Sequence, residues 1–179
     1  MFFHSLETVR RIVTPLLAFS IVVMVLATFG ARWSSDGFQM IRYTVKSKES
    51  ELYSGSAAAF AVILPYPFLA PFWFGFTAIV MYLNLAIASI YIFWNIIQIV
   101  IPDRFGRNSA QRLVFIDAIF SGVFAILLIL AFSFYAGGLN GSTARQYVGF
   151  GYCFYFTIVA SITCLASFII AMLGVLRGN

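Results

Sequence analysis

The chain has 179 residues, of which 62% are hydrophobic and only 9% are charged, whereas about a quarter of the residues in a soluble domain are charged. So few charges cannot cover a surface exposed to water, which excludes a soluble globular protein and indicates that lipid covers most of the molecule. The net charge of +5 comes from single and paired cations at the ends of apolar stretches, which excludes a nucleic-acid-binding surface and is typical of residues that flank membrane spans.

The first predicted transmembrane helix covers about residues 12–31, an uncharged stretch just long enough to cross a bilayer. Glu7, Arg10 and Arg11 precede it. A signal peptide is the alternative, but its apolar core would be only about 7–15 residues long, so we expect a retained helix. In the charged loop that follows, β-branched and aromatic residues at positions 38–45 allow a small extended segment.

Residues 52–102 carry no charge and are long enough for more than one span. Three prolines interrupt the first part of this stretch, the last of them Pro71, and each removes a helical hydrogen-bond donor. We therefore predict an extended or re-entrant approach to the membrane at residues 57–71 and a second helix at about residues 74–101. Two full spans are the alternative, but they would require a tight turn at Pro71 without polar residues.

A short basic loop, residues 102–112, leads into the third predicted helix at about residues 113–135. A Gly-rich loop at residues 136–146 contains turn-forming residues, and the fourth predicted helix covers about residues 147–176. The sequence thus predicts an all-α fold, in which one domain consists of a bundle of four transmembrane helices joined by short loops. An even number of crossings places the two termini on the same side of the membrane.

The orientation of the bundle is indicated by Asn140-Gly-Ser142, which matches the acceptor pattern for N-glycosylation. Glycosylation of Asn140 would place this loop in the lumen or outside the cell, and would make both termini cytoplasmic. Lys and Arg do not decide the orientation, because the loops on the two sides carry nearly equal numbers of them. A plain Asn-Gly turn is the alternative interpretation of the same residues.

Asp117 is the most informative single residue, because it lies inside the third predicted span. An ionisable side chain in a span is costly and usually faces the interior of the bundle or a partner. We expect a structural tether to Arg10 or Arg11, which flank the first span on the same side, or to Arg112. A proton or ion site is the alternative, but no second buried acid or cation continues a path across the membrane.

Three amides lie on the second predicted span: Asn84, Asn95 and Gln98. The first two are close to three helical turns apart and share a face, with Gln98 near it. We expect these amides to form hydrogen bonds between helices, and a polar line for a permeating solute is the alternative. Small residues recur at helical spacing in the fourth span and allow close helix packing, within the bundle or with a partner: Ala160, Cys164, Ser167 and Ala171.

No combination of residues that would perform catalysis occurs in the sequence. His4 is the only histidine, and Cys153 and Cys164 lie too far apart along one helix to form a disulfide. There is no Cys-x-x-Cys, no phosphate-binding Gly-rich loop and no Ser/His/Asp set. We therefore expect a protein that is not an enzyme, with no catalytic residue, no cofactor and no metal site.

The third span resembles that of the MARVEL group of tetraspan proteins, particularly the synaptogyrin and synaptophysin branch. The resemblance is carried by Leu113–Tyr135, with Asp117-x-x-Phe120-Ser121 near its start, and by Arg10-Arg11 before the first span. The luminal cysteines and the long cytoplasmic tail of that branch are missing. The claudin group, also four-span, has a Trp, a Gly-Leu-Trp and two cysteines in its first extracellular loop, and here that loop has only Trp33.

The resemblance implies a non-enzymatic protein of vesicles or the plasma membrane that organises membrane areas or takes part in vesicle trafficking. Its expected partners are membrane lipids and other integral membrane proteins or further copies of itself. Two alternatives stay open. The chain could be a small auxiliary subunit of a larger channel, pump or respiratory assembly, or an oligomeric channel or transporter with Asn84, Asn95 and Asp117 along its path.

Overall fold

The computed structural model describes residues 6–30, 33, 72–100, 110–141 and 149–177, without the side chains of Phe74 and Arg177. The extended segment expected at residues 38–45 and the approach expected at 57–71 lie outside these ranges, as does most of the loop 102–112. Four helices are present in the described residues: α1 (Leu6–Phe29), α2 (Phe72–Val100), α3 (Ala110–Asn140) and α4 (Tyr152–Arg177). Each contains a stretch long and apolar enough to cross a membrane.

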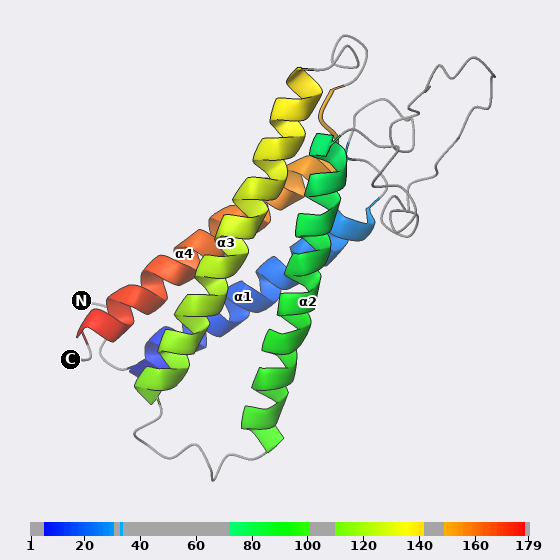
Figure 1. Ribbon diagram of the computed structural model, residues 1–179. Helices are drawn as coiled ribbons and strands as arrows, with labels where there is room; N and C mark the ends of the chain where they lie inside the picture. Colours follow the sequence, from blue (N-terminus) through cyan, green and yellow to red (C-terminus); the bar gives the residue numbers. More distant parts are fainter. Residues whose placement is uncertain (1–5, 31–32, 34–71, 101–109, 142–148, 178–179) are drawn as a thin grey trace, which may run out of the picture.

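The four helices run alternately up and down in a bundle, so that α1 begins and α4 ends at the same end (Figure 1). This arrangement confirms the predicted all-α four-helix fold. α4 packs against both α1 and α3, whereas α2 lies mainly against α3, with few contacts to α1 and fewer still to α4. The order around the bundle is therefore α1, α4, α3, α2, and α2 is the helix with the smallest share in the common core.

Close packing of α4 against its neighbours depends on small side chains. Ala160, Cys164, Ser167 and Ala171 are all buried, so the small residues recognised in the sequence face the interior of the bundle. Near the end of α4, a Cβ added to Gly174 would lie 2.8 Å from Cγ1 of Val9 in α1. Only glycine therefore allows the two helices to approach this closely, and van der Waals contact is the main attraction between helices in lipid.

Hydroxyl groups in the helices find acceptors within the bundle, because lipid offers none. The hydroxyl groups of Thr28 and Thr157 donate to the carbonyl groups of Met24 and Cys153, four residues earlier in their own helices. One pair joins two helices, since the hydroxyl oxygens of Ser20 in α1 and Thr163 in α4 lie 2.6 Å apart. The buried serines and threonines thus remain hydrogen-bonded without disturbing the helices.

Three helix ends differ from the sequence prediction by five or more residues: α4 begins at Tyr152 rather than at about residue 147, and the other two are the start of α1 and the end of α3. α1 begins at Leu6, before the predicted start at residue 12, and its first turns include the buried Val9. α3 continues through the glycines to Asn140, so the loop predicted from residue 136 is wrong. Tyr135 and Leu139 explain this extension, because both side chains are fully buried on one face of the helix, one turn apart.

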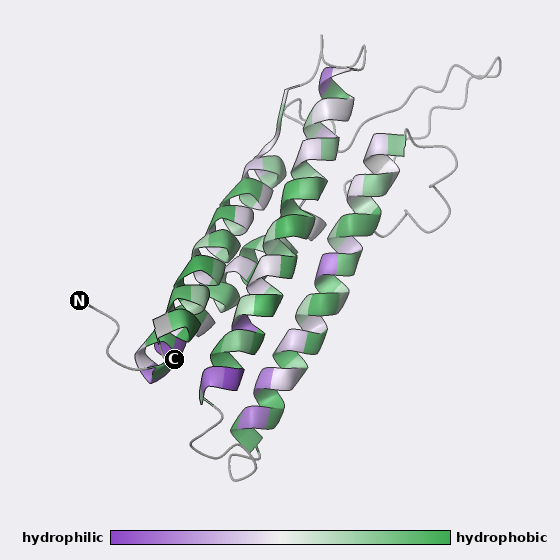
Figure 2. Ribbon diagram, turned by 60° about the vertical axis from the view of Figure 1, so that its left-hand side comes forward, coloured by the Kyte–Doolittle hydropathy of each residue, from purple (hydrophilic) through white to green (hydrophobic). Residues whose placement is uncertain are grey.

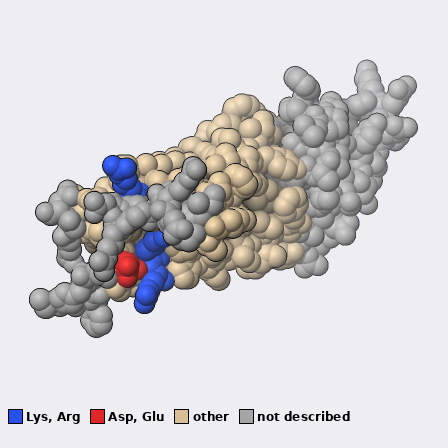
Figure 3. All heavy atoms as spheres, turned by 90° about the horizontal axis from the view of Figure 1, so that it is seen from below, with Lys and Arg blue, Asp and Glu red and all other residues tan. Residues whose placement is uncertain are grey.

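The outer surface of the bundle is apolar. Large side chains point outward from every helix, among them Phe19, Phe93, Ile126 and Ile162. Figure 2 shows helices that are mostly hydrophobic along their length, with several hydrophilic residues at their lower ends. The described charged side chains lie toward one end, and the middle of the visible face carries none (Figure 3). Such a surface matches the hydrocarbon interior of a bilayer.

Candidate functional site

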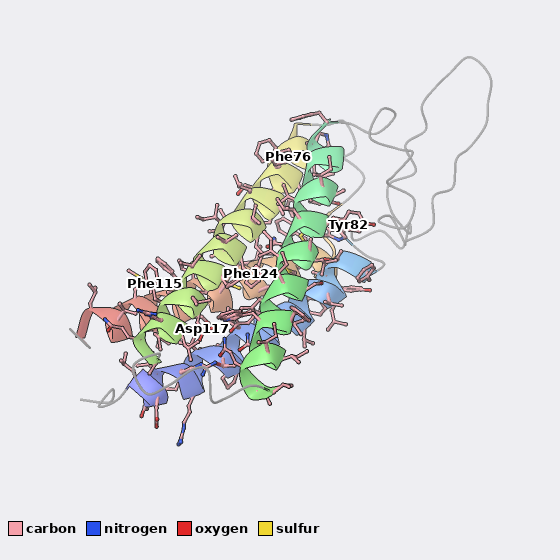
Figure 4. All side chains as sticks on the ribbon, turned by 60° about the horizontal axis from the view of Figure 1, so that its bottom comes forward. Phe76, Tyr82, Phe115, Asp117 and Phe124 are labelled. Carbon is pink, nitrogen blue, oxygen red and sulfur yellow. The ribbon has the colours of Figure 1, made fainter. Side chains whose placement is uncertain are left out.

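Four polar side chains from three helices meet inside the bundle, toward the end where α1 begins. They are Arg10 from α1, Tyr91 and Gln98 from α2, and Asp117 from α3, and we refer to them as the polar cluster. Figure 4 places Asp117 in the lower part of α3, among side chains of the neighbouring helices. Because α3 begins at Ala110, Asp117 lies about 10 Å along the helix, which is deeper than the predicted span implied.

Asp117 is the centre of the polar cluster. Its carboxylate oxygen Oδ2 lies 3.8 Å from Nε of Arg10, and its Oδ1 accepts a hydrogen bond of 3.0 Å from the Tyr91 hydroxyl. The Asp117 side chain is 2% exposed, whereas that of Arg10 is 31% exposed. The buried carboxylate therefore has a cation on one side and a neutral donor on the other, and the cation itself still reaches the surface.

Arg10 also connects α1 to α2 directly. Its guanidinium group donates a hydrogen bond through Nη2 to Oε1 of Gln98. α1 and α2 make few other contacts, so the polar cluster supplies much of what holds this end of α2 against α1. Of the three predicted candidates for pairing with Asp117, the structure brings Arg10 to it, while Arg11 and Arg112 are exposed.

Aromatic rings shield the Tyr91 side of the polar cluster from lipid. The Tyr91 ring packs against Phe120 at a centroid distance of 5.0 Å and meets Phe124 edge-on at 6.3 Å. Both phenylalanines belong to α3 and lie one and two turns beyond Asp117. The ring of Tyr91 is thus held in place by its contacts with α3, and its hydroxyl donates to the carboxylate of Asp117.

The three amides of α2 behave differently from one another. Gln98 accepts the hydrogen bond from Arg10, and Asn95 donates through Nδ2 to the carbonyl of Tyr91 in its own helix at 2.9 Å. Asn84 is fully buried, and neither its Oδ1 nor its Nδ2 has a hydrogen-bond partner. The amides therefore do not form one hydrogen-bonded set, and only Gln98 bonds to another helix.

Tyr91 was not among the candidates recognised in the sequence. The signal that could have found it is spacing, because Tyr91 follows Asn84 by seven residues and so lies on the same buried face of α2. A carboxylate inside a span also needs donors in addition to a cation, and a tyrosine on a facing helix supplies such a donor from a largely apolar side chain.

The chemistry open to the polar cluster is limited by its composition. In the four helices the carboxylates are Glu7, which is exposed, and the buried Asp117. The described residues contain no group of three or more His, Cys, Asp or Glu side chains that could hold a metal ion. A single carboxylate that is already paired with a cation suits a fixed connection between helices. A proton or ion relay would require a second acceptor further across the membrane.

Asn140, the predicted glycosylation residue, is the last residue of α3 and is exposed. Ser142, which completes the acceptor pattern, lies outside the described residues. Whether Asn140 carries a glycan therefore stays a prediction.

Comparison with known proteins identifies a family whose model matches the chain. A family model described as "Tight junction protein, Claudin-like" matches residues 6–174 of the chain. No curated protein and no solved structure matches the chain. The match supports the four-span membrane class that the resemblance in the third span also implied, but it points to the claudin-like group rather than to the MARVEL group.

Proposed function

Because the chain belongs to the claudin-like family of tetraspan membrane proteins, we propose that it is a structural, non-enzymatic protein of the plasma membrane at contacts between cells. In this function the bundle is a rigid anchor that makes lateral contacts with lipids, with other integral membrane proteins and with further copies of itself. Both termini lie in the cytoplasm. The connection between α1 and α2 then faces the outside, where it meets a neighbouring membrane.

The observation that carries this proposal is the extent of the family match. It begins at the first residue of α1 and ends within the last turn of α4, so it covers all four helices and every connection between them. The likeness therefore concerns the whole arrangement of the chain rather than one hydrophobic segment, which many unrelated membrane proteins could share.

The polar cluster fits a structural function. Asp117, Arg10 and Tyr91 come from three different helices, and the ion pair and the hydrogen bond that join them form only while the three helices stay together. In lipid a charged side chain without its partner is costly, so these residues oppose the sliding or separation of α1, α2 and α3. We propose that the polar cluster is a tether that keeps the bundle in one shape while its outer surface makes contacts.

The proposal is tested by the distribution of the protein between cells. A tagged chain is expressed in cells that are then mixed with non-expressing cells, and its density is measured along each kind of border. We expect enrichment where two expressing cells meet. Borders with non-expressing neighbours serve as the matched control, because a protein that acts by contact with its own copies gathers there less.

Two other results would contradict this proposal and favour the alternatives. Accumulation in intracellular vesicles, with no enrichment at borders, would favour the vesicle-trafficking function that the MARVEL resemblance implies. Purification in mild detergent with a larger complex at fixed stoichiometry would instead indicate an auxiliary subunit. Both measurements can be made while the identity of the partner is still unknown.

A further inference from the structure

Tyr135 lies at the centre of an aromatic cluster at the end of the bundle opposite the polar cluster. Its ring centroid is 5.0 Å from that of Trp33, which follows α1, and 5.5 Å from that of Trp73 in the first turn of α2. Phe150, just before α4, and Phe154, in its first turn, complete the cluster at centroid distances of 6.4 Å and 5.9 Å from Tyr135. One fully buried side chain of α3 therefore touches residues associated with all the other helices.

Trp33 is fixed from three directions. Its indole Nε1 donates a hydrogen bond of 2.9 Å to the carbonyl of Ala27 in α1, and its own carbonyl accepts one of 2.8 Å from the backbone nitrogen of Gly151. Its ring rests on Tyr135, and the residue is 2% exposed. Trp33 is thus part of the folded bundle, although it lies beyond the end of α1.

Trp73 packs directly against the backbone of α3 at Gly138, which has no side chain. A Cβ added to Gly138 would lie 1.9 Å from Cγ of Trp73 and 2.4 Å from its Cβ. No side chain larger than hydrogen fits at this position, and the indole occupies the space that a Cβ would take. Gly138 therefore explains why Trp73 can approach the backbone of α3 one turn from Tyr135.

Trp33 and Trp73 flank residues 34–71, the segment of the sequence that connects α1 with α2. Residues 34–71, the segment between them, contain no cysteine, because Cys153 and Cys164 both lie in α4 as free thiols. No disulfide can therefore fix this segment. Holding the two ends of a long connection together costs chain entropy, and here non-covalent contacts with a single ring oppose that cost.

From this geometry we propose that Tyr135 is the positioning residue for the connection between α1 and α2. By contacting Trp33 and Trp73 on either side, it sets the spacing between the two ends of segment 34–71. The inference that this spacing matters for contact with a second copy of the chain on a neighbouring cell rests on the proposed function. The spacing itself does not depend on it.

The spacing is measured with a pair of spin labels introduced by Phe29→Cys and Phe72→Cys, in a chain whose two native cysteines are replaced by alanine. Both labelled positions are exposed, at 59% and 76%, and both flank the aromatic cluster. The purified full chain is placed in lipid nanodiscs, and the distribution of distances between the labels is recorded by pulsed electron paramagnetic resonance.

We expect Tyr135→Leu to shift the distribution to longer distances and to broaden it, and Tyr135→Phe to leave it unchanged because the ring is retained. Tyr155→Leu is the matched control, since the exposed Tyr155 lies at the same end of the bundle and its ring packs on Phe154 rather than on Trp33 or Trp73; it should leave the distance between the labels unchanged. An unchanged distribution for Tyr135→Leu in folded protein would overturn the proposal.

A second variant keeps the proposal testable if Tyr135→Leu does not fold. Gly138→Ala displaces Trp73 while Tyr135 and Trp33 remain, so it should also lengthen the distance between the labels. The enrichment of each variant at borders between expressing cells is then measured separately. If the wild-type chain shows no enrichment, the proposed function fails while the distance measurement still decides the role of Tyr135.

Discussion

Nε of Arg10 in α1 lies 3.8 Å from Oδ2 of Asp117 in α3, and the Asp117 side chain is almost completely buried. The two residues are more than a hundred positions apart in the sequence, and the span between them is α2. The contact therefore links α1 to α3. The helix α2 joins the same link, because its Gln98 bonds to Arg10 and its Tyr91 bonds to Asp117.

Asp117→Asn should lower the free energy of unfolding by about 1–3 kcal/mol, less than the roughly 3–5 kcal/mol for a fully buried pair, because Arg10 can turn toward the membrane surface. Unfolding by detergent in mixed micelles measures this change. A double-mutant cycle with Arg10→Gln should show coupling between the two residues. Unchanged stability together with the loss of a measured ion flux would contradict the tether and favour an ion site.

Tyr91→Phe should destabilise the protein by about 1–2 kcal/mol, because it removes a hydrogen bond to a charged group and keeps the ring contacts with Phe120 and Phe124. Tyr155→Phe, on the exposed face of α4, is the matched control and should change stability little. The same unfolding assay applies to both variants. Equal effects at the two positions would show that the Tyr91 hydroxyl does not support Asp117.

Gly174→Ala should destabilise the bundle by about 1–3 kcal/mol, because its Cβ would overlap Val9 and separate α1 from α4. The same substitution at Gly137 offers a direct comparison, since a Cβ there meets no atom within 4 Å. At that position alanine should be neutral or stabilising by up to about 1 kcal/mol through its helix propensity. Thermal unfolding followed by circular dichroism would compare the two, and a stabilised Gly174→Ala would refute the close approach.

Asn84→Leu should raise the free energy of unfolding by about 1–3 kcal/mol, because it replaces a buried amide without hydrogen-bond partners by an apolar side chain of similar size. Detergent unfolding of the purified protein tests this directly. If the variant is instead less stable, the amide of Asn84 bonds to a group supplied in the membrane, and the polar line considered from the sequence regains support.

The sequence predicted the four-helix class well because that class depends on composition and on the length of uncharged stretches, which need no knowledge of contacts. It predicted the end of α3 poorly. Gly137 and Gly138 favour a turn when judged locally, whereas in the bundle Trp73 fills the space beside Gly138 and the buried Leu139 continues the helix. Tertiary packing therefore overrides the local preference.

The polar cluster was predictable in part, because the cost of a charge inside a membrane span can be judged from the sequence alone. A charge inside a span requires a cation on the same side, so Arg10 could be proposed as one of three partners for Asp117. The choice among the three, and the contribution of Tyr91, depend on how the helices are rotated about their axes. That rotation depends on packing between helices, such as the close approach of Gly174 in α4 to Val9 in α1, and one sequence does not reveal it.

The connection between Arg10 and Asp117 also bears on how the protein is made. The ribosome delivers α1 and α2 before α3, so Arg10 and Tyr91 have already been synthesised when Asp117 reaches the membrane. Asp117 can therefore pair with Arg10 and Tyr91 as soon as α3 enters the bilayer beside α1 and α2. The charge of Asp117 gains its partners only after α3 has come to lie beside both α1 and α2 in the bilayer.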